Sequence, residues 1–141
     1  MAKRQERHQA IRTIVRENVI RTQQELADQL KKQGFECTQA TISRDIADLG
    51  LVKSRTGRYA LPEEIRLRRL VSDLVVEVHA ASNLVIIKAT VGGAAGVCAA
   101  LDEAKLPGVL GTVAGDDTIL LVADTPDSAR SVEQAILMFK G

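Results

Sequence analysis

The chain has 141 residues, enough for one domain or two small ones, and a hydrophobic content of 45% that can build a packed core. Aromatic residues make up only 2%, so the core must be aliphatic and few rings can stack on single-stranded nucleic acid. Residues 1–70 carry 15 Lys and Arg against 9 Asp and Glu (net +6), and residues 71–141 carry 4 against 9 (net −5). This asymmetry predicts two domains with different partners.

Targeting, membrane and metal signals are weak. The first 16 residues are charged throughout and lack the apolar stretch of a signal peptide, and no segment approaches the length of a membrane span. Cys37 and Cys98 stand far apart without a CxxC motif. We therefore expect a soluble cytoplasmic protein with no metal site, no cofactor and no membrane partner.

Three helices are predicted in the basic half. Apolar residues recur at helical spacing over residues 5–17 and indicate the first helix. The sequence TQQE at residues 22–25 fits a capping box, and Gly34 stands where a second helix would end. A third helix is predicted to be capped by Thr38 and to end at Gly50.

The outward face of the third helix has an unusual composition. Its side chains are small or hydrogen-bonding, whereas a solvated helix face is usually richer in Glu and Lys. A helix that enters the major groove needs small residues for close approach and polar ones to contact base edges or phosphates. We therefore predict a recognition helix. Its outward residues are Gln39, Ala40, Thr41, Ser43, Arg44 and Ala47.

A basic hairpin is predicted after the third helix, in the sequence LVKSRTGRYALP, with its turn at Thr56-Gly57. Lys53, Arg55 and Arg58 would gather near its tip, where they could contact phosphates or the minor groove. Three helices and a basic hairpin make a winged helix-turn-helix, which we place at residues 1–62.

The next segment, PEEIRLRRL, begins with proline and two acids, a pattern typical of a helix start. It predicts a short helix over Pro62–Leu70 within a linker at residues 63–72. Its three arginines either are solvated or add to the contacts with phosphates. They are Arg66, Arg68 and Arg69.

The acidic half, residues 73–141, predicts the order ββαββα. Strands are expected at Leu74–His79 and Leu84–Val91, then an alanine-rich helix from GGAAG, then two strands flanking GDD. A last helix is expected after its cap, Thr125. The expected fold class is α+β, with the helices on one face of the sheet. So small a domain, with few aromatics, is expected to gain further burial by pairing with other copies of itself.

Two other functions stay open from the residues alone. A strand, the sequence GGAAG, a helix, and Asp116 about 20 residues on resemble a dinucleotide fingerprint, which would indicate an enzyme or an enzyme-regulatory subunit. The glycines read GGxxG, however, and not GxGxxG. An architectural DNA-binding protein without an effector is the other alternative.

The sequence TQATISRDIADLGLVK resembles the DNA-reading segment of bacterial arginine repressors, and LDEAKLPGVLGTVAGDDTILLV is similar to their arginine-binding and assembly core. The resemblance covers essentially the whole chain. It implies a winged-helix domain before a core that forms trimers. L-arginine would act as corepressor: bound between two trimers, it would favour a hexamer on operator DNA that represses arginine-biosynthesis genes and often activates catabolic ones.

The resemblance also implies roles for single residues. Asp117 would meet the guanidinium of L-arginine, Asp116 would assist, and Asp102 would lie near the ligand. Ser43 and Arg44 match the Ser-Arg pair of the recognition helix. The chain departs from the family pattern at GGAAG, where Ala95 or Gly96 replaces a Gln or His near the ligand, so that one side-chain contact is lost.

Overall fold

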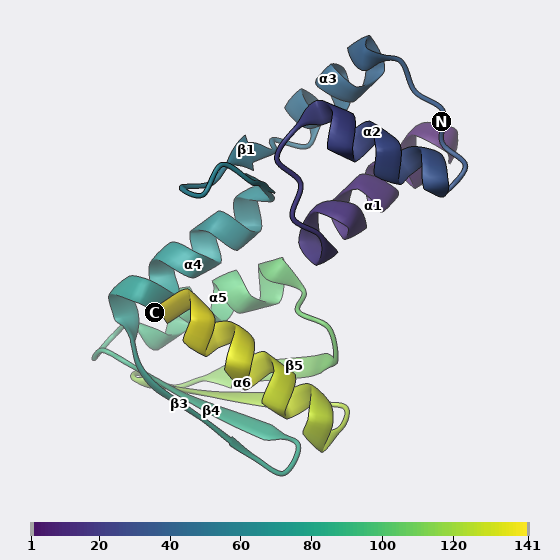
Figure 1. Ribbon diagram of the computed structural model, residues 1–141. Coiled ribbons are helices and arrows are strands. Elements are labelled where there is room, and N and C mark those ends of the chain that lie inside the picture. Colours follow the sequence, from purple (N-terminus) through teal and green to yellow (C-terminus); the bar gives the residue numbers. More distant parts are fainter. Residues whose placement is uncertain (1, 141) are drawn as a thin grey trace. The chain divides into compact units, whose positions relative to one another are not determined.

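The computed structural model describes residues 2–140, and the chain forms two compact units that divide between Ile65 and Arg66. Within residues 2–140, no helix is both long and apolar enough to cross a membrane. Each unit has its own aliphatic core. The fold is the expected α+β class, with a winged helix-turn-helix followed by a ββαββα unit (Figure 1).

The first unit has three helices and a short hairpin. Thr22 and Thr38 cap the second and third helices, each accepting a hydrogen bond at 3.1 Å from a backbone N–H three residues on, which confirms both predicted starts. The first helix begins three residues earlier than predicted. The elements are α1 (Ala2–Glu17), α2 (Gln23–Lys32), α3 (Gln39–Asp48), β1 (Val52–Lys53) and β2 (Tyr59–Ala60).

The core of this unit joins the apolar stripes of the helices to the base of the hairpin. Ile14, Leu26 and Ile42, one from each helix, are almost completely buried, and Leu61 closes the core after the hairpin. The chain leaves α3 through Gly50, whose φ of +66° is a left-handed conformation that favours glycine. Helix α3, the predicted recognition helix, therefore packs into the core along the side that carries Ile42.

The helix after the hairpin, α4 (Pro62–Leu74), is four residues longer than predicted. Leu67 and Val71 on it are fully buried in the core of the second unit. Arg66 pairs with Glu103 at 3.1 Å. Arg68 lies 5.2 Å from the centre of the Phe139 ring. Two of the three arginines that were predicted to be solvated or to bind phosphates, Arg66 and Arg68, therefore have partners inside the second unit.

The second unit follows the predicted order. Its four strands form an antiparallel sheet in the order β3-β4-β6-β5, and α5 and α6 cover one face of it (Figure 1). Val85, Ile87, Ile119 and Leu121 face these helices and are completely buried. The elements are β3 (Val75–Ala81), β4 (Leu84–Ala89), α5 (Ala94–Ala104), β5 (Val109–Ala114), β6 (Thr118–Ala123) and α6 (Pro126–Lys140).

The opposite face of the sheet is apolar and open within one copy of the chain. Ile86 pairs with Leu120, and Leu120 pairs with Val113, so these side chains lie together on that face. Val113 is 69% exposed and Leu120 36% exposed. Alternation along each strand separates this face from the fully buried one.

The sheet contradicts the dinucleotide-binding alternative. That site needs parallel strands joined by a crossover helix, whereas every strand pair here is antiparallel. The glycines have a local cause instead. Gly92 has a φ of +79°, and a side chain at Gly93 would meet the Thr90 hydroxyl at 2.8 Å. The predicted strand Leu84–Val91 consequently ends at Ala89, where this turn begins.

Candidate DNA-binding and ligand-binding sites

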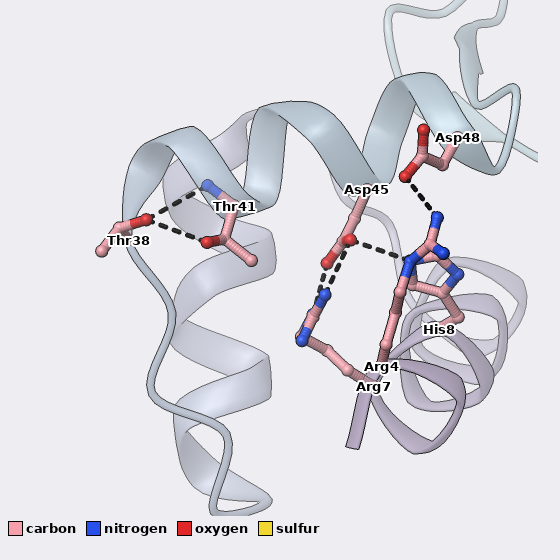
Figure 2. Close-up of polar contacts among 7 residues, drawn as sticks. All are labelled: Arg4, Arg7, His8, Thr38, Thr41, Asp45 and Asp48. Carbon is pink, nitrogen blue, oxygen red and sulfur yellow. Dashed lines mark hydrogen bonds and ion pairs between the residues drawn. The ribbon is translucent and has the colours of Figure 1, made fainter. Parts of the chain in front are cut away.

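The predicted recognition face of α3 is open. Gln39, Ser43 and Arg44 are exposed on it, and Arg44 has no hydrogen bond or ion pair among residues 2–140. Thr41 is half-buried, and its hydroxyl and backbone N–H both lie within 3.1 Å of Thr38 Oγ1 (Figure 2). Gln39, Ser43 and Arg44 can therefore contact a ligand, while Thr41 belongs to the helix cap.

The other side of α3 is tied to α1 by charge. Asp45 is 1% exposed, and its carboxylate accepts hydrogen bonds from Arg7 Nε at 2.5 Å and Arg7 Nη2 at 3.0 Å. His8 Nε2 lies 2.8 Å from the same carboxylate, and Arg4 pairs with Asp48 one turn further on, also at 2.8 Å (Figure 2). Forked guanidinium–carboxylate pairs fix orientation as well as distance, so this network sets how α3 lies on α1.

The electrostatics of the network follow its geometry. Burial opposes ionisation of Asp45, but the hydrogen bonds and charges of Arg7 and His8 outweigh burial and lower the pKa of this carboxyl. The hydrogen bond to Asp45 raises the pKa of Arg7. Burial raises the pKa of the nearby Cys37 thiol, which therefore stays protonated at neutral pH.

Three potential metal ligands meet in this network. Ligand atoms of His8, Asp45 and Asp48 lie within 4.8 Å of one another, the one such group among the described residues. A metal ion would compete with Arg4 and Arg7, which already donate to the two carboxylates. We interpret the group as a network of ion pairs. The sequence signal for it was Asp45 itself, a charge three residues after Ile42 on the buried stripe of α3.

The three basic residues of the wing differ in exposure and in their partners within the chain. Lys53 and Arg55 are exposed, with Lys53 lying 5.4 Å from the centre of the Tyr59 ring. Arg58 is half-buried and donates to the backbone oxygens of Val15 and Asn18 at 3.4 Å. The geometry leaves Lys53 and Arg55 available to an anionic partner, while Arg58 holds the wing against the end of α1.

The two adjacent acids of the second unit occupy the tip of a hairpin. Asp116 and Asp117 are exposed at the turn between β5 and β6. Asp116 Oδ2 accepts a hydrogen bond from Gly92 N at 3.3 Å, while Asp117 Oδ1 accepts one from the Thr118 hydroxyl at 2.9 Å. Neither has a cationic partner among residues 2–140. The predicted hairpin turn thus carries two carboxylates that a cation could bind.

Asp102 lies elsewhere in the same unit. It accepts a hydrogen bond at 2.6 Å from Thr112, in the middle of β5, and lines a hollow of about 250 Å³ beside Lys105 and Gly111. Thr112 is four residues before Asp116 along the strand, a separation of about 13 Å. Within the described residues of one copy, no hydrogen bond or ion pair joins Asp102 to the hairpin acids or to their partners Gly92 and Thr118.

Comparison with known families covers both units. A family described as arginine repressor, DNA binding domain, matches residues 2–67, and one described as arginine repressor, C-terminal domain, matches residues 71–137. The arginine repressor of Carboxydothermus hydrogenoformans is 48% identical over 83% of this chain and 85% of its own. Those of Thermus thermophilus and Bacillus subtilis are 43% and 39% identical, over 94% of this chain and 88% and 95% of their own.

Proposed function

Because this chain belongs to the arginine repressor family, whose members are DNA-binding regulators and not enzymes, we propose that it controls transcription in response to L-arginine in the cytoplasm. Residues 1–62 would bind double-stranded operator DNA and residues 73–141 would bind L-arginine and assemble, with residues 63–72 linking the two. Repression of arginine-biosynthesis genes is its main role, and activation of arginine catabolism is a further one.

The observation that carries this proposal is the pair of hairpin carboxylates, Asp116 and Asp117. They are adjacent, exposed and without a cationic partner among the described residues. A guanidinium is planar and offers forked donors that match carboxylate oxygens. Each of the two carboxylates accepts one hydrogen bond within the chain, at one of its oxygens, so each keeps its second oxygen for a guanidinium. We assign the direct contact with the guanidinium to Asp117 and a supporting role to Asp116.

Assembly would couple the ligand to DNA binding. The open face of the sheet, with Ile86, Val113 and Leu120, is the surface that we assign to contacts within a trimer. Asp102 and the hairpin acids are separate in one copy, so a pocket that uses all three needs a second subunit. The carboxylates would repel one another in the empty interface, and bound L-arginine would neutralise them. The hexamer would therefore bind L-arginine more tightly than the trimer does, so that the ligand favours the hexamer.

Sedimentation with and without L-arginine tests the proposal. We expect trimers without the amino acid, hexamers with it, and an operator affinity that rises in parallel. L-lysine, which is cationic but lacks the planar guanidinium, is the matched control and should have a much weaker effect. A mass and an operator affinity that L-arginine leaves unchanged would rule out the arginine-dependent function.

One observation favours a second candidate, an architectural DNA-binding protein without an effector. Ala95 and Gly96 on the first turn of α5 offer no polar side chain to a ligand near Asp116. The same sedimentation separates the two functions, since an architectural protein would bind DNA equally well with and without L-arginine.

A further inference from the structure

A hydrogen bond joins the recognition helix to the start of α2. The hydroxyl of Ser43 donates to Gln23 Oε1 at 2.9 Å, across 20 residues of sequence. Ser43 is exposed on the side of α3 that faces away from the buried Ile42 and Asp45. The contact therefore lies on the surface that we assign to DNA.

This contact fixes what each side chain can offer to a ligand. A serine hydroxyl has one proton, so Ser43, once it donates to Gln23, presents its oxygen as an acceptor. The amide of Gln23 still has its N–H groups. The amide nitrogen of Gln23 donates to no other residue among those described. It is also not one of the buried nitrogen atoms that lack a hydrogen-bond partner, so it is accessible to a ligand. The pair presents an acceptor from α3 beside a donor from α2.

Ordered structure holds Gln23 in place. It is the first residue of α2, directly after the cap Thr22, which accepts the backbone N–H of Glu25 at 3.1 Å. The Glu25 carboxylate in turn accepts the backbone N–H of Arg21 at 2.7 Å. Both helices are anchored by fully buried residues, Leu26 on α2 and Ile42 on α3. The backbones that carry Gln23 and Ser43 are therefore already ordered before a ligand binds, which lowers the entropy cost of binding.

We propose that Gln23 and Ser43 together recognise a base of operator DNA, an inference that rests on the proposed DNA-binding function. We call this hydrogen-bonded pair the reading unit. Ser43 accepts from a base amino group and the amide of Gln23 donates to a base acceptor. In the major groove, adenine offers an amino group beside a ring-nitrogen acceptor. Gln23 is thus a specificity-determining residue outside the recognition helix, and it also positions the hydroxyl of Ser43.

A double-mutant cycle on the full-length chain tests this unit. The probe is a duplex that the wild-type chain selects from random-sequence DNA. Gln23→Ala and Ser43→Ala should each weaken its binding about tenfold, because each leaves the other group without its partner. If the two act as a unit, the double variant should also lose about tenfold, whereas independent contacts would lose about a hundredfold. Binding to an unselected duplex should stay unchanged in all three.

Gln24→Ala is the matched control. Gln24 is the next residue, but its amide donates at 2.9 Å to Asp28 on its own helix, so selected-duplex binding should not change. Thermal unfolding of every variant separates recognition from stability. A hundredfold loss in the double variant, or equal losses on both duplexes, would overturn the reading unit. A wild-type chain that selects no sequence would instead overturn the proposed function.

Discussion

Asp45 in the first unit and Asp117 in the second are both carboxylates on small, aliphatic-cored units, but their surroundings are opposite. Asp45 is buried and surrounded by Arg7 and His8, whereas Asp117 is exposed at a hairpin tip with one hydroxyl neighbour. A buried carboxylate must be paired to be tolerated, while an exposed one costs little to leave open. The difference separates an acid that holds the fold from an acid that is free to bind a ligand.

The largest expected effect comes from neutralising the buried acid. Asp45→Asn leaves the guanidinium of Arg7 beside a neutral amide, so we expect the free energy of unfolding of the first unit to fall by about 3–5 kcal/mol. Denaturant titration followed by fluorescence of Tyr59 measures it, because Tyr59 is the single tyrosine of the chain, no tryptophan is present, and Tyr59 is buried in that unit.

Asp48→Asn is the control for that measurement. The Arg4–Asp48 pair lies on the same two helices but is partly exposed, so we expect a loss below about 1 kcal/mol. Equal losses in the two variants would contradict the claim that burial gives Asp45 its structural role.

Neutralising the exposed acid Asp117 should affect ligand binding and leave stability unchanged, the opposite of the result expected for Asp45. Asp117→Asn removes a charge that has no cationic partner among the described residues, so folding should be unchanged while affinity for L-arginine falls by about 10- to 100-fold. Calorimetric titration measures the affinity. Asp127→Asn, at an acid that already pairs with Arg130 on α6, should leave it unchanged. Retained arginine affinity in Asp117→Asn would remove Asp117 from the proposed site.

Local sequence patterns predicted most of the fold and the open acid. Threonine caps marked the starts of α2 and α3, and the GDD turn placed Asp116 and Asp117 at a hairpin tip. These features depend on residues within a few positions of one another. A pattern of neighbouring residues is therefore enough to predict them.

Long-range pairings could not be predicted in the same way. Asp45 meets Arg7 across 38 residues, and only the packing of α3 on α1 decides which basic residues reach it. The Gln23–Ser43 contact depends on the angle between α2 and α3, and the partner of Arg58 on the position of the wing. Periodicity assigns a residue to a face of its helix, but it does not identify the residue that will lie opposite.

A substitution at Arg44 tests whether one side of α3 stabilises the fold while the opposite side binds DNA. Arg44 immediately precedes Asp45, yet it is exposed and unpaired among the described residues. We expect Arg44→Ala to weaken operator binding by about 1–3 kcal/mol, with unchanged stability and unchanged arginine affinity. Gel-shift titration and thermal unfolding measure the two quantities. Unchanged operator affinity would contradict the assignment of this face to DNA.

The smallest effect is expected on the stability of the first unit in mild acid. It tests the contrast between buried Asp45 and exposed Asp117 through the lowered pKa of Asp45. Because that pKa is lower in the folded chain than its ordinary value of about 3.9, the unfolded state binds more protons as the pH falls. The contribution of Asp45 is therefore complete above about pH 5 and is lost progressively as the pH falls through 4 toward the folded pKa. We expect Tyr59-monitored stability of the first unit to decline over that range, and Asp45→Asn to flatten the decline because asparagine does not titrate. An equal pH slope in the variant would mean that other acids of the unit control its acid sensitivity.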